Sequence, residues 1–455
     1  MMPVQQADFL TDGLIGRWQR DRSEVFRFGD RTLVSETGEI RLEYELDGIA
    51  LVETFQLPDA PYAVPKARQR AVDEALDLLH WTAGISYWKA GCPARFEFAV
   101  SRPDPWQAEW LTRLWREGLA EFAWHNDLNV EDWPEFPAEA SARESTFALG
   151  LGERTLVPMG GGKDSLVALE RMLSARQPVD TVQVGSAPLI CEVAARAGQP
   201  HRVVRRRIDP SLAELNRHGA FNGHVPITAI NSAVLALLAL GGDYRRVVFA
   251  NERSADEQTL IDAQGRAVNH QFSKSLAFEC MFSDWVRRYI AADLEVFSIL
   301  RRDRELAICR EFAGLARYHN VFSSCNRNFH LDGPRTGRWC GQCPKCHFVF
   351  LAMAPFLSPE RMTAIFGHDL LAEGDNLEGF RQLLALDGIK PFECVGEAME
   401  ARAALLALAA SPCWKHHVVV SALAPLLSEL DVPTVDVLCQ PTGDHLIPDD
   451  LLAEA

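Results

Sequence analysis

The chain has 455 residues, with 46 Lys and Arg against 62 Asp and Glu, which gives a formal net charge of −16. Its 47% of hydrophobic and 24% of charged residues are typical of folded globular proteins and exclude disorder or a coiled coil over most of the chain. The acidic balance argues against nucleic-acid partners, which need an extended basic surface, but not against a small anionic substrate.

The sequence shows no signal for export or membrane insertion. Charged side chains such as Asp8 and Arg17 interrupt the first 25 residues, which therefore lack the apolar core of a secretion signal. The longest uncharged stretch, residues 218–242, has a polar start, and its purely apolar part, 233–240, is too short to cross a bilayer. Eleven cysteines then point to reduced thiols or metal ligands. We expect a cytoplasmic protein without a membrane span.

Residues 1–145 are predicted to form an α+β N-terminal domain. Stretches 41–46 and 49–57 have the pattern of strands, and stretches 72–81 and 110–124 place apolar residues at helical spacing. Eight of the eleven tryptophans lie in this first third. They could form a stacking platform for a base or sugar, but we favour packed core or a domain interface. Pro134, Pro137 and the small, polar segment 139–144 predict a linker.

From residue 150 predicted strands and helices alternate. The strands are residues 155–159, 181–185, 201–208, 245–250 and 294–300, and the helices are 164–176, 188–197, 226–240 and 273–290. Such alternation predicts an α/β domain with a parallel sheet, helices on both faces and ligands at the carboxyl ends of the strands. We assign residues 150–320 to this nucleotide-binding domain, 321–400 to a cysteine-cluster and substrate segment, and 401–455 to a helical tail.

A glycine-rich turn joins the first of these strands to its helix. Three consecutive glycines expose backbone N–H groups next to a helix N-terminus, an arrangement suited to phosphate. A Walker A loop does not fit, because Val157 stands where it requires glycine and Asp164 where it requires Ser or Thr. The dinucleotide-binding fingerprint fits badly as well, because Ser165 replaces its third glycine. The predicted phosphate and magnesium ligands are Gly160, Gly161, Gly162, Lys163, Asp164 and Ser165.

This turn resembles the Ser-Gly-Gly-x-Asp-Ser loop of the ATP pyrophosphatases, the PP-loop family. The resemblance implies a HUP-like fold and an enzyme that splits ATP into AMP and pyrophosphate while adenylating a substrate oxygen. Gly160 stands in place of the first serine, which removes one hydroxyl donor and leaves backbone groups to compensate. An ordinary strand–helix turn is the alternative, which the Lys-Asp-Ser continuation disfavours.

Four cysteines lie within 22 residues further along the chain. Cys340, Cys343 and Cys346 have Cys-x-x-Cys-x-x-Cys spacing, and Cys325 precedes them by fifteen positions. A turn of this kind can wrap four thiolates around one tetrahedral zinc ion. An iron–sulfur cluster has compatible spacing and remains open, although we favour structural zinc.

Several strings in a common order carry a resemblance that extends over nearly the whole chain. They are residues 79–89, 118–122, 160–165, 222–226, 251–254, 269–275, 324–328 and 390–396. Together they are similar to the MurL family of bacterial peptidoglycan synthesis. The resemblance implies an ATP- and magnesium-dependent inversion of the terminal L-glutamate of UDP-MurNAc-L-Ala-L-Glu, with release of AMP and pyrophosphate.

Two other interpretations stay open. One is a PP-loop amidase, nitrile synthase or sulfurtransferase that acts on a base or tRNA, as in 7-cyano-7-deazaguanine synthase, although the acidic charge disfavours tRNA. The other is a regulatory module that binds ATP without turnover. No oligomeric state follows from the sequence.

Adenylation would make the glutamate Cα–H acidic enough for a modest base, because it removes the charge of the neighbouring carboxylate. The candidate acid–base residues in the matching strings are His224, His270, Lys274 and Cys394. At the end of the fourth strand Glu252 can ligate magnesium and Arg253 can clamp a phosphate or the γ-carboxylate of the substrate glutamate. Residues 205–207, three arginines at the end of the third strand, could face the diphosphate of UDP or ATP, and a solvated triplet is the alternative. We expect a basic cleft in an acidic exterior.

Overall fold

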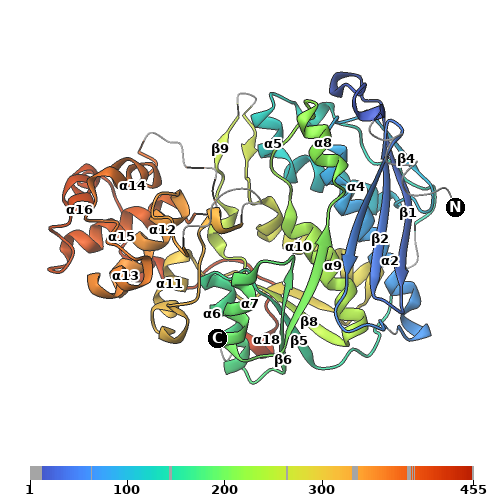
Figure 1. The fold of residues 1–455 in the computed structure, drawn as a ribbon. Helices are drawn as coiled ribbons and strands as arrows, with labels where there is room; N and C mark the ends of the chain where they lie inside the picture. The colour runs from blue at the N-terminus through green and yellow to red at the C-terminus, as the bar shows by residue number, and fades with distance from the viewer. Residues whose placement is uncertain are drawn as a thin grey trace.

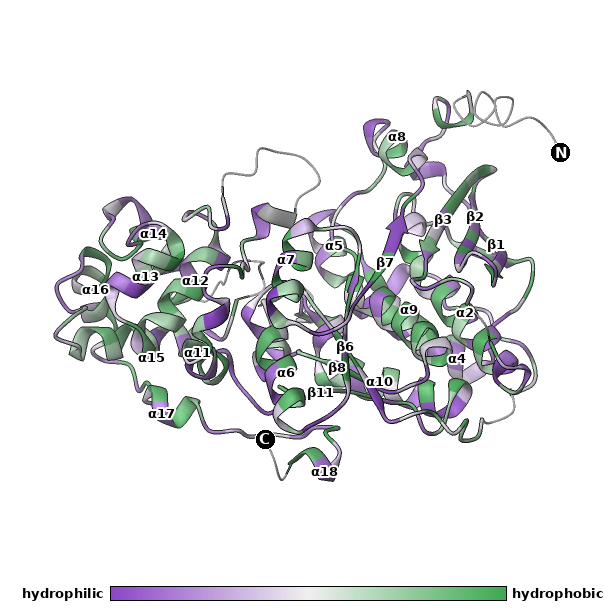
Figure 2. Ribbon diagram, turned by 60° about the horizontal axis from the view of Figure 1, so that its bottom comes forward, coloured by the Kyte–Doolittle hydropathy of each residue, from purple (hydrophilic) through white to green (hydrophobic). Residues whose placement is uncertain are grey.

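A computed structural model of the chain describes residues 13–452 except 63, 143–145, 263–264, 330–336, 387–390, 392 and 394. It is a mixed α/β structure built on one large, mostly parallel sheet, with the N-terminal strands and the C-terminal helices at opposite ends of the molecule (Figures 1 and 2). No helix among these residues is long and apolar enough to cross a membrane.

The sheet has nine strands in the order β11-β8-β5-β6-β7-β3-β2-β1-β4. The five predicted strands form its parallel half, from β11 to β7. They are β5 (Arg154–Pro158), β6 (Val179–Val184), β7 (His201–Arg207), β8 (Tyr244–Phe249) and β11 (Glu295–Ser298). The other half comprises β1 (Val25–Val34), β2 (Glu39–Leu46), β3 (Ile49–Gln56) and β4 (Arg95–Phe98). Sequence patterning did not predict β1 and β4.

Helices cover both faces of the parallel half, as the alternation predicted. Along the strands, Leu156 and Val247 pack into one hydrophobic cluster, whereas their neighbours Val157 and Val248 pack into the other. Because successive strand residues point to opposite faces, each face has its own core. The first core contains α2 (Gln69–Ala83), α4 (Pro105–Gly118), α9 (Ile227–Gly242) and α10 (Leu276–Trp285), and the second contains α6 (Lys163–Ser174), α7 (Pro188–Ala197) and α11 (Glu305–Ala313).

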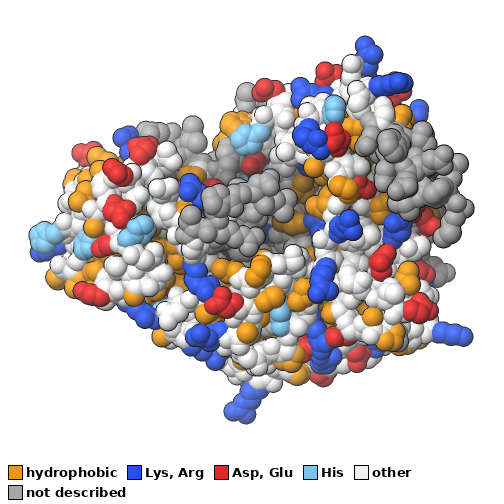
Figure 3. Space-filling model, in the orientation of Figure 1, with side chains coloured by type: hydrophobic (Ala, Val, Ile, Leu, Met, Phe, Trp, Pro, Cys, Tyr) orange, Lys and Arg blue, Asp and Glu red, His pale blue; other side chains and the backbone are white. Residues whose placement is uncertain are grey.

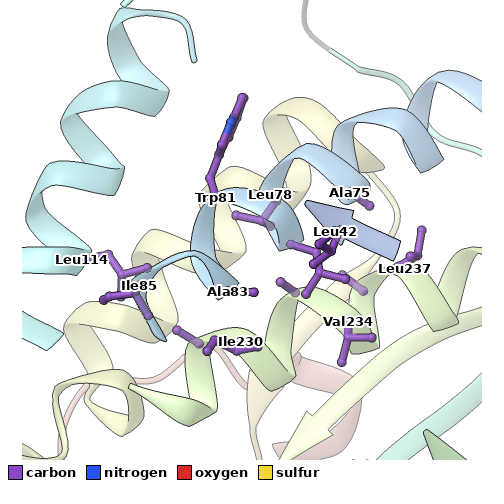
Figure 4. Close-up of a cluster of buried hydrophobic side chains, with 14 of the residues drawn as sticks. Leu42, Ala75, Leu78, Trp81, Ala83, Ile85, Leu114, Ile230, Val234 and Leu237 are labelled. Carbon is purple, nitrogen blue, oxygen red and sulfur yellow. The ribbon is translucent and has the colours of Figure 1, made fainter. Parts of the chain in front are cut away.

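The N-terminal core explains most of the tryptophans. Apolar side chains of β2, α2 and α9 interlock there, and Trp81 projects from α2 toward the other side of the helix (Figure 4). Trp81 and Trp88 are fully buried, and Trp285 packs edge-on against both Trp81 and Trp110. The packed-core interpretation is therefore confirmed for these residues.

The C-terminal part is helical from α12 onward. Its helices are α12 (Pro344–Met353), α13 (Pro359–Phe366), α14 (Leu377–Leu383), α15 (Ala398–Ala410), α16 (Val418–Leu423), α17 (Val435–Leu438) and α18 (Asp449–Leu452). The last segment returns to the parallel half of the sheet, where Asp450 forms an ion pair with Arg246 of β8 at 2.8 Å (Figure 1).

Antiparallel pairing of β3 with β7 joins the two halves of the sheet. Thr54, Phe55 and Gln56 pair with Arg207, Arg206 and Arg205. Of the arginine triplet, Arg206 is used at this junction, where it forms a buried ion pair with Glu53 of β3, whereas the side chains of Arg205 and Arg207 are exposed. This pairing connects residues on both sides of the proposed linker, and the four-part division of the chain stays a prediction.

The Glu53–Arg206 pair should dominate the stability of this junction. Burial raises the pKa of Glu53 although Arg206 opposes the shift, so an unpaired Glu53 carboxylate would be costly. We expect Arg206→Met to lower the free energy of unfolding by about 3–5 kcal/mol, measured by urea denaturation. A second change, Glu53→Gln, should recover part of this loss. Equal stability of the single and double variants would contradict the assigned role.

Candidate functional site

The glycine turn connects β5 to α6 at the carboxyl edge of the sheet. Gly161 has φ +78°, a left-handed backbone conformation that favours glycine. Gly162 is the N-cap of α6, and Ser165 Oγ accepts from Gly160 N–H at 3.3 Å and donates to the Gly162 carbonyl at 3.1 Å. The turn is thereby held around the N-terminus of a twelve-residue helix, where backbone dipoles favour an anion.

Lys163 is fully buried directly after this turn. Its Nζ forms ion pairs with Asp164 and with Glu305, the first residue of α11. The other carboxylate oxygen of Glu305 lies 3.5 Å from Lys345 Nζ. Burial alone would lower the pKa of Lys163, but Asp164 and Glu305 raise it well above the usual value, so the amine stays charged. For Glu305, burial opposes ionisation, yet Lys163 and Lys345 lower its pKa.

Glu252 lies in the same polar cluster, at the end of β8. Burial, reinforced by the charges of Glu305 and Asp164, raises the pKa of Glu252, while Lys274 and Lys345 oppose that shift. Three lysines and three carboxylates thus gather beside the turn: Lys163, Lys274, Lys345, Asp164, Glu252 and Glu305. A cation that binds the carboxylates and an anion that binds the lysines could enter together without leaving net buried charge.

Buried Arg301 fixes two of the segments that carry this cluster. Its guanidinium donates to the Glu252 carbonyl at 3.0 Å and to the Lys274 carbonyl at 2.7 Å, and it forms an ion pair with Glu279 at 2.7 Å. Sequence reasoning missed Arg301, Glu305 and Lys345. Glu305 and Arg301 follow the last parallel strand, where ligand residues are expected, and Lys345 lies inside the cysteine motif.

Arg253 points away from this cluster. Its guanidinium hydrogen-bonds to Thr442 of the C-terminal segment, and its backbone N–H donates to the Asp303 carbonyl at 2.8 Å. On the face drawn in Figure 3, Lys and Arg side chains are interspersed with Asp and Glu. The positive charge near the turn therefore comes from lysines matched by carboxylates rather than from a purely basic cleft.

Two of the predicted acid–base residues form a second polar cluster next to the first. The rings of His224 and His270 have centroids 6.5 Å apart. His224 Nδ1 lies 3.2 Å from a carboxylate oxygen of Glu121, and His270 Nδ1 hydrogen-bonds with Thr259 Oγ1 at 2.9 Å. Burial, with the charges of His270, Lys274 and Lys89, lowers the pKa of His224 to about 4.

Lys274 influences both clusters, since its charge acts on His224 and on Glu252. Cys394, the remaining predicted acid–base residue, lies outside the described residues, as do Lys390 and Phe392 of the string 390–396. Glu121 was not predicted from the sequence. It lies near the start of α5 (Ala120–His125), inside the matching string 118–122, which was the signal that could have identified it.

A cavity of about 1020 Å³ lies near the histidine cluster, although its lining does not include His224, His270 or Glu121. Its walls come from α4, α5 and the hairpin of β9 (Leu260–Ile261) and β10 (Ala267–Val268), and they include Asn269 next to His270. The volume of this cavity is large enough for a ligand of the size of a sugar nucleotide.

The four cysteines Cys325, Cys340, Cys343 and Cys346 come together, with their sulfurs within 4.8 Å of one another. Sγ–Sγ distances are 4.0 Å for Cys325–Cys343, 3.7 Å for Cys340–Cys346 and 3.4 Å for Cys343–Cys346. Tetrahedral zinc with Zn–S bonds of about 2.3 Å would place its sulfurs about 3.8 Å apart. Two backbone N–H groups, of Cys343 and Cys346, point at the sulfurs of Cys340 and Cys343 at 3.4 Å. This donor set fits one thiophilic metal ion.

Comparison with known proteins covers nearly the entire chain. The family model described as the MurL N-terminal domain matches residues 17–299, and the MurL C-terminal domain matches residues 321–436. A relative from Xanthomonas oryzae pv. oryzae, named UDP-N-acetyl-alpha-D-muramoyl-L-alanyl-L-glutamate epimerase, is 44% identical over 95% of this chain and 96% of its own. Relatives of the same name from Micromonospora sp. and Salinispora tropica are each 39% identical, over 94% and 90% of this chain and 97% and 90% of theirs. The chain therefore belongs to the MurL family.

Proposed function

We propose that this protein inverts the terminal L-glutamate of UDP-MurNAc-L-Ala-L-Glu to the D form in an ATP-dependent reaction of peptidoglycan synthesis. The observation that carries the proposal is the adjacency of two clusters: a phosphate-type turn with balanced charges, and a histidine pair that Lys274 links to it. Relatives that match this chain from end to end are named as epimerases of that substrate, which supports the choice of reaction.

The turn would serve the activation step. A carboxylate oxygen of the substrate glutamate attacks the α-phosphorus of ATP, and pyrophosphate leaves. The N–H groups of the turn, Lys163 and Ser165 would bind the phosphates, and Asp164 and Glu252 would hold magnesium, whose role is to neutralise phosphate charge. The resulting mixed anhydride lacks the negative charge that makes Cα–H removal difficult in the free carboxylate.

The histidine pair would move the Cα proton. Burial lowers the pKa of His224 to about 4, so its ring is neutral at physiological pH and has a lone pair available for the Cα proton, while the lowered pKa makes it a weaker base than a free imidazole. His270, with its ring centroid 6.5 Å away, would return a proton from the opposite face of Cα. Lys274 supplies positive charge nearby for the developing enolate. Water then attacks the acyl carbon and AMP leaves.

The cavity beside this pair would receive the rest of the substrate. It adjoins His270 through Asn269 and is large enough for a sugar nucleotide portion that extends away from the glutamate. The substrate would thus place its peptide end between the clusters.

For the cysteine cluster we propose structural zinc. All four thiolates would bind a single ion and close the site, whereas the thiolates of a cubane iron–sulfur cluster bind separate irons and lie further apart. The short sulfur separations support the single ion.

Activation is tested by Asp164→Asn in deuterated water with ATP, magnesium and the L-glutamate substrate. The unaltered enzyme should incorporate deuterium at the glutamate Cα and invert its configuration. NMR measures the deuterium, and chiral analysis measures the configuration. Asp164→Asn should lose at least about a hundredfold of this rate, because it removes a magnesium ligand and a charge partner of Lys163. The exposed change Asp284→Asn is the control. Release of AMP and pyrophosphate without exchange would contradict the proposal.

Proton transfer is tested separately by His224→Gln. We expect deuterium incorporation to fall by about a hundredfold or more, whereas substrate-dependent exchange of labelled pyrophosphate into ATP should persist. His218→Gln is a matched control, because exposed His218 makes an equivalent 3.2 Å contact with Glu214. Loss of both activities in His224→Gln would assign this residue to activation instead.

The metal is tested by elemental analysis of the purified protein. One zinc ion per chain and no visible absorbance are expected. Cys343→Ser should lose the zinc, and the exposed Cys413→Ser should retain it. Iron with inorganic sulfide in the untreated protein would contradict the assignment.

A further inference from the structure

We propose that the segment preceding the cysteine cluster supplies part of the phosphate site: the hydroxyl of Ser324 replaces the serine that the glycine turn lacks, and Lys345 positions Lys163. This inference rests on the ATP binding proposed above. The cysteine-rich segment would then contribute side chains to the nucleotide site in addition to binding a metal.

The glycine turn lacks a hydroxyl where its family resemblance would place one. Gly160 occupies that position, and a Cβ on Gly160 would meet nothing within 4 Å. No described atom therefore takes the place of the missing serine at Gly160 itself, and a hydroxyl that replaces it must reach the phosphate from beside another glycine of the turn.

Ser324 comes close to the turn from the cysteine side. A Cβ on Gly162 would lie 2.7 Å from Ser324 Oγ, so glycine is also needed there to admit this hydroxyl. The oxygen is buried and has no hydrogen-bond partner among the described residues. A buried hydroxyl is costly when unpaired, and a phosphate oxygen in the turn would satisfy it.

The neighbouring residue Ser323 holds this approach in place. Its backbone N–H donates to the Gly161 carbonyl at 3.0 Å. Its hydroxyl donates to the Arg338 carbonyl at 2.6 Å and accepts from the N–H of Cys325 at 3.1 Å. Segment 323–325, which would present Cys325 to the metal, therefore also places Ser324 next to the phosphate site.

Lys345 makes the second connection between the two sites. It lies between Cys343 and Cys346, so a bound metal fixes the backbone on both sides of it. Its Nζ shares the Glu305 carboxylate with Lys163. With Lys345 in place, Glu305 is oriented by two amines and can hold Lys163 toward the turn.

Binding of ATP with magnesium, measured by calorimetry together with zinc content, tests the role of Ser324. Ser324→Ala should weaken ATP binding about tenfold or more while zinc is retained, as expected for loss of a hydrogen bond to a charged group. Gly160→Ser in the Ser324→Ala background should restore much of the affinity, because it returns the hydroxyl to the turn. The exposed Ser421→Ala is the control.

For Lys345 we expect Lys345→Met to weaken ATP binding several-fold and Lys345→Arg to restore it, with zinc unchanged in both. Lys415→Met, at an exposed position, should have no effect.

Three results would overturn the inference: unchanged ATP affinity in Ser324→Ala, zinc loss that accounts for its weaker binding, or no restoration by Gly160→Ser. If the unaltered protein itself fails to bind ATP, the proposed function fails as well. If it binds ATP and only the Ser324 comparison fails, the proposed function stands.

Discussion

A buried lysine that must remain charged next to the glycine turn is the constraint on which the rest of the site depends. Lys163 has no access to water, so its charge requires carboxylates from elsewhere in the chain. Asp164 comes from the same helix, but Glu305 comes from α11, and Lys345 of the cysteine segment shares that carboxylate. The ion pairs of Lys163 and Glu305 thus connect the helix after the first strand of the parallel half, the helix after the last one, and the cysteine segment.

The carboxyl edge of the sheet gathers what the proposed chemistry needs in two adjoining regions. Arg301 donates hydrogen bonds to the backbone carbonyls of Glu252 and Lys274 and so holds these two segments together. The charge of Lys274 acts both on Glu252, beside the glycine turn, and on His224. Activation of a carboxylate and removal of the proton next to it involve neighbouring atoms of one substrate. A single site with two chemically distinct halves would suit the proposed reaction, and the N-terminal part contributes Glu121 to the histidine cluster.

Much of this organisation could be predicted from the sequence because it is local. Strand and helix patterning placed all five strands of the parallel half, and the glycine and cysteine motifs marked the turn and the thiol cluster. His224 and His270 were named because they lie in strings of the family resemblance, not because a motif paired them. Contacts between segments that are far apart in the chain could not be predicted, because no pattern within either segment indicates its partner. The pairing of β3 with β7, which uses Arg206 in the sheet, depends on strand edges meeting in space. The roles of Glu305, Lys345 and Glu121 likewise depend on which side chains the folded sheet brings together.

Adenylation of the substrate carboxylate is the central claim, and an oxygen label tests it most directly. The α-carboxylate of the substrate glutamate is prepared with ¹⁸O and turned over with ATP and magnesium. Because water attacks the acyl carbon, AMP should leave with one of the labelled oxygens, detectable by mass spectrometry and by the ³¹P shift. AMP free of label during epimerisation would contradict the account, since the carboxylate would never have bonded to the α-phosphorus.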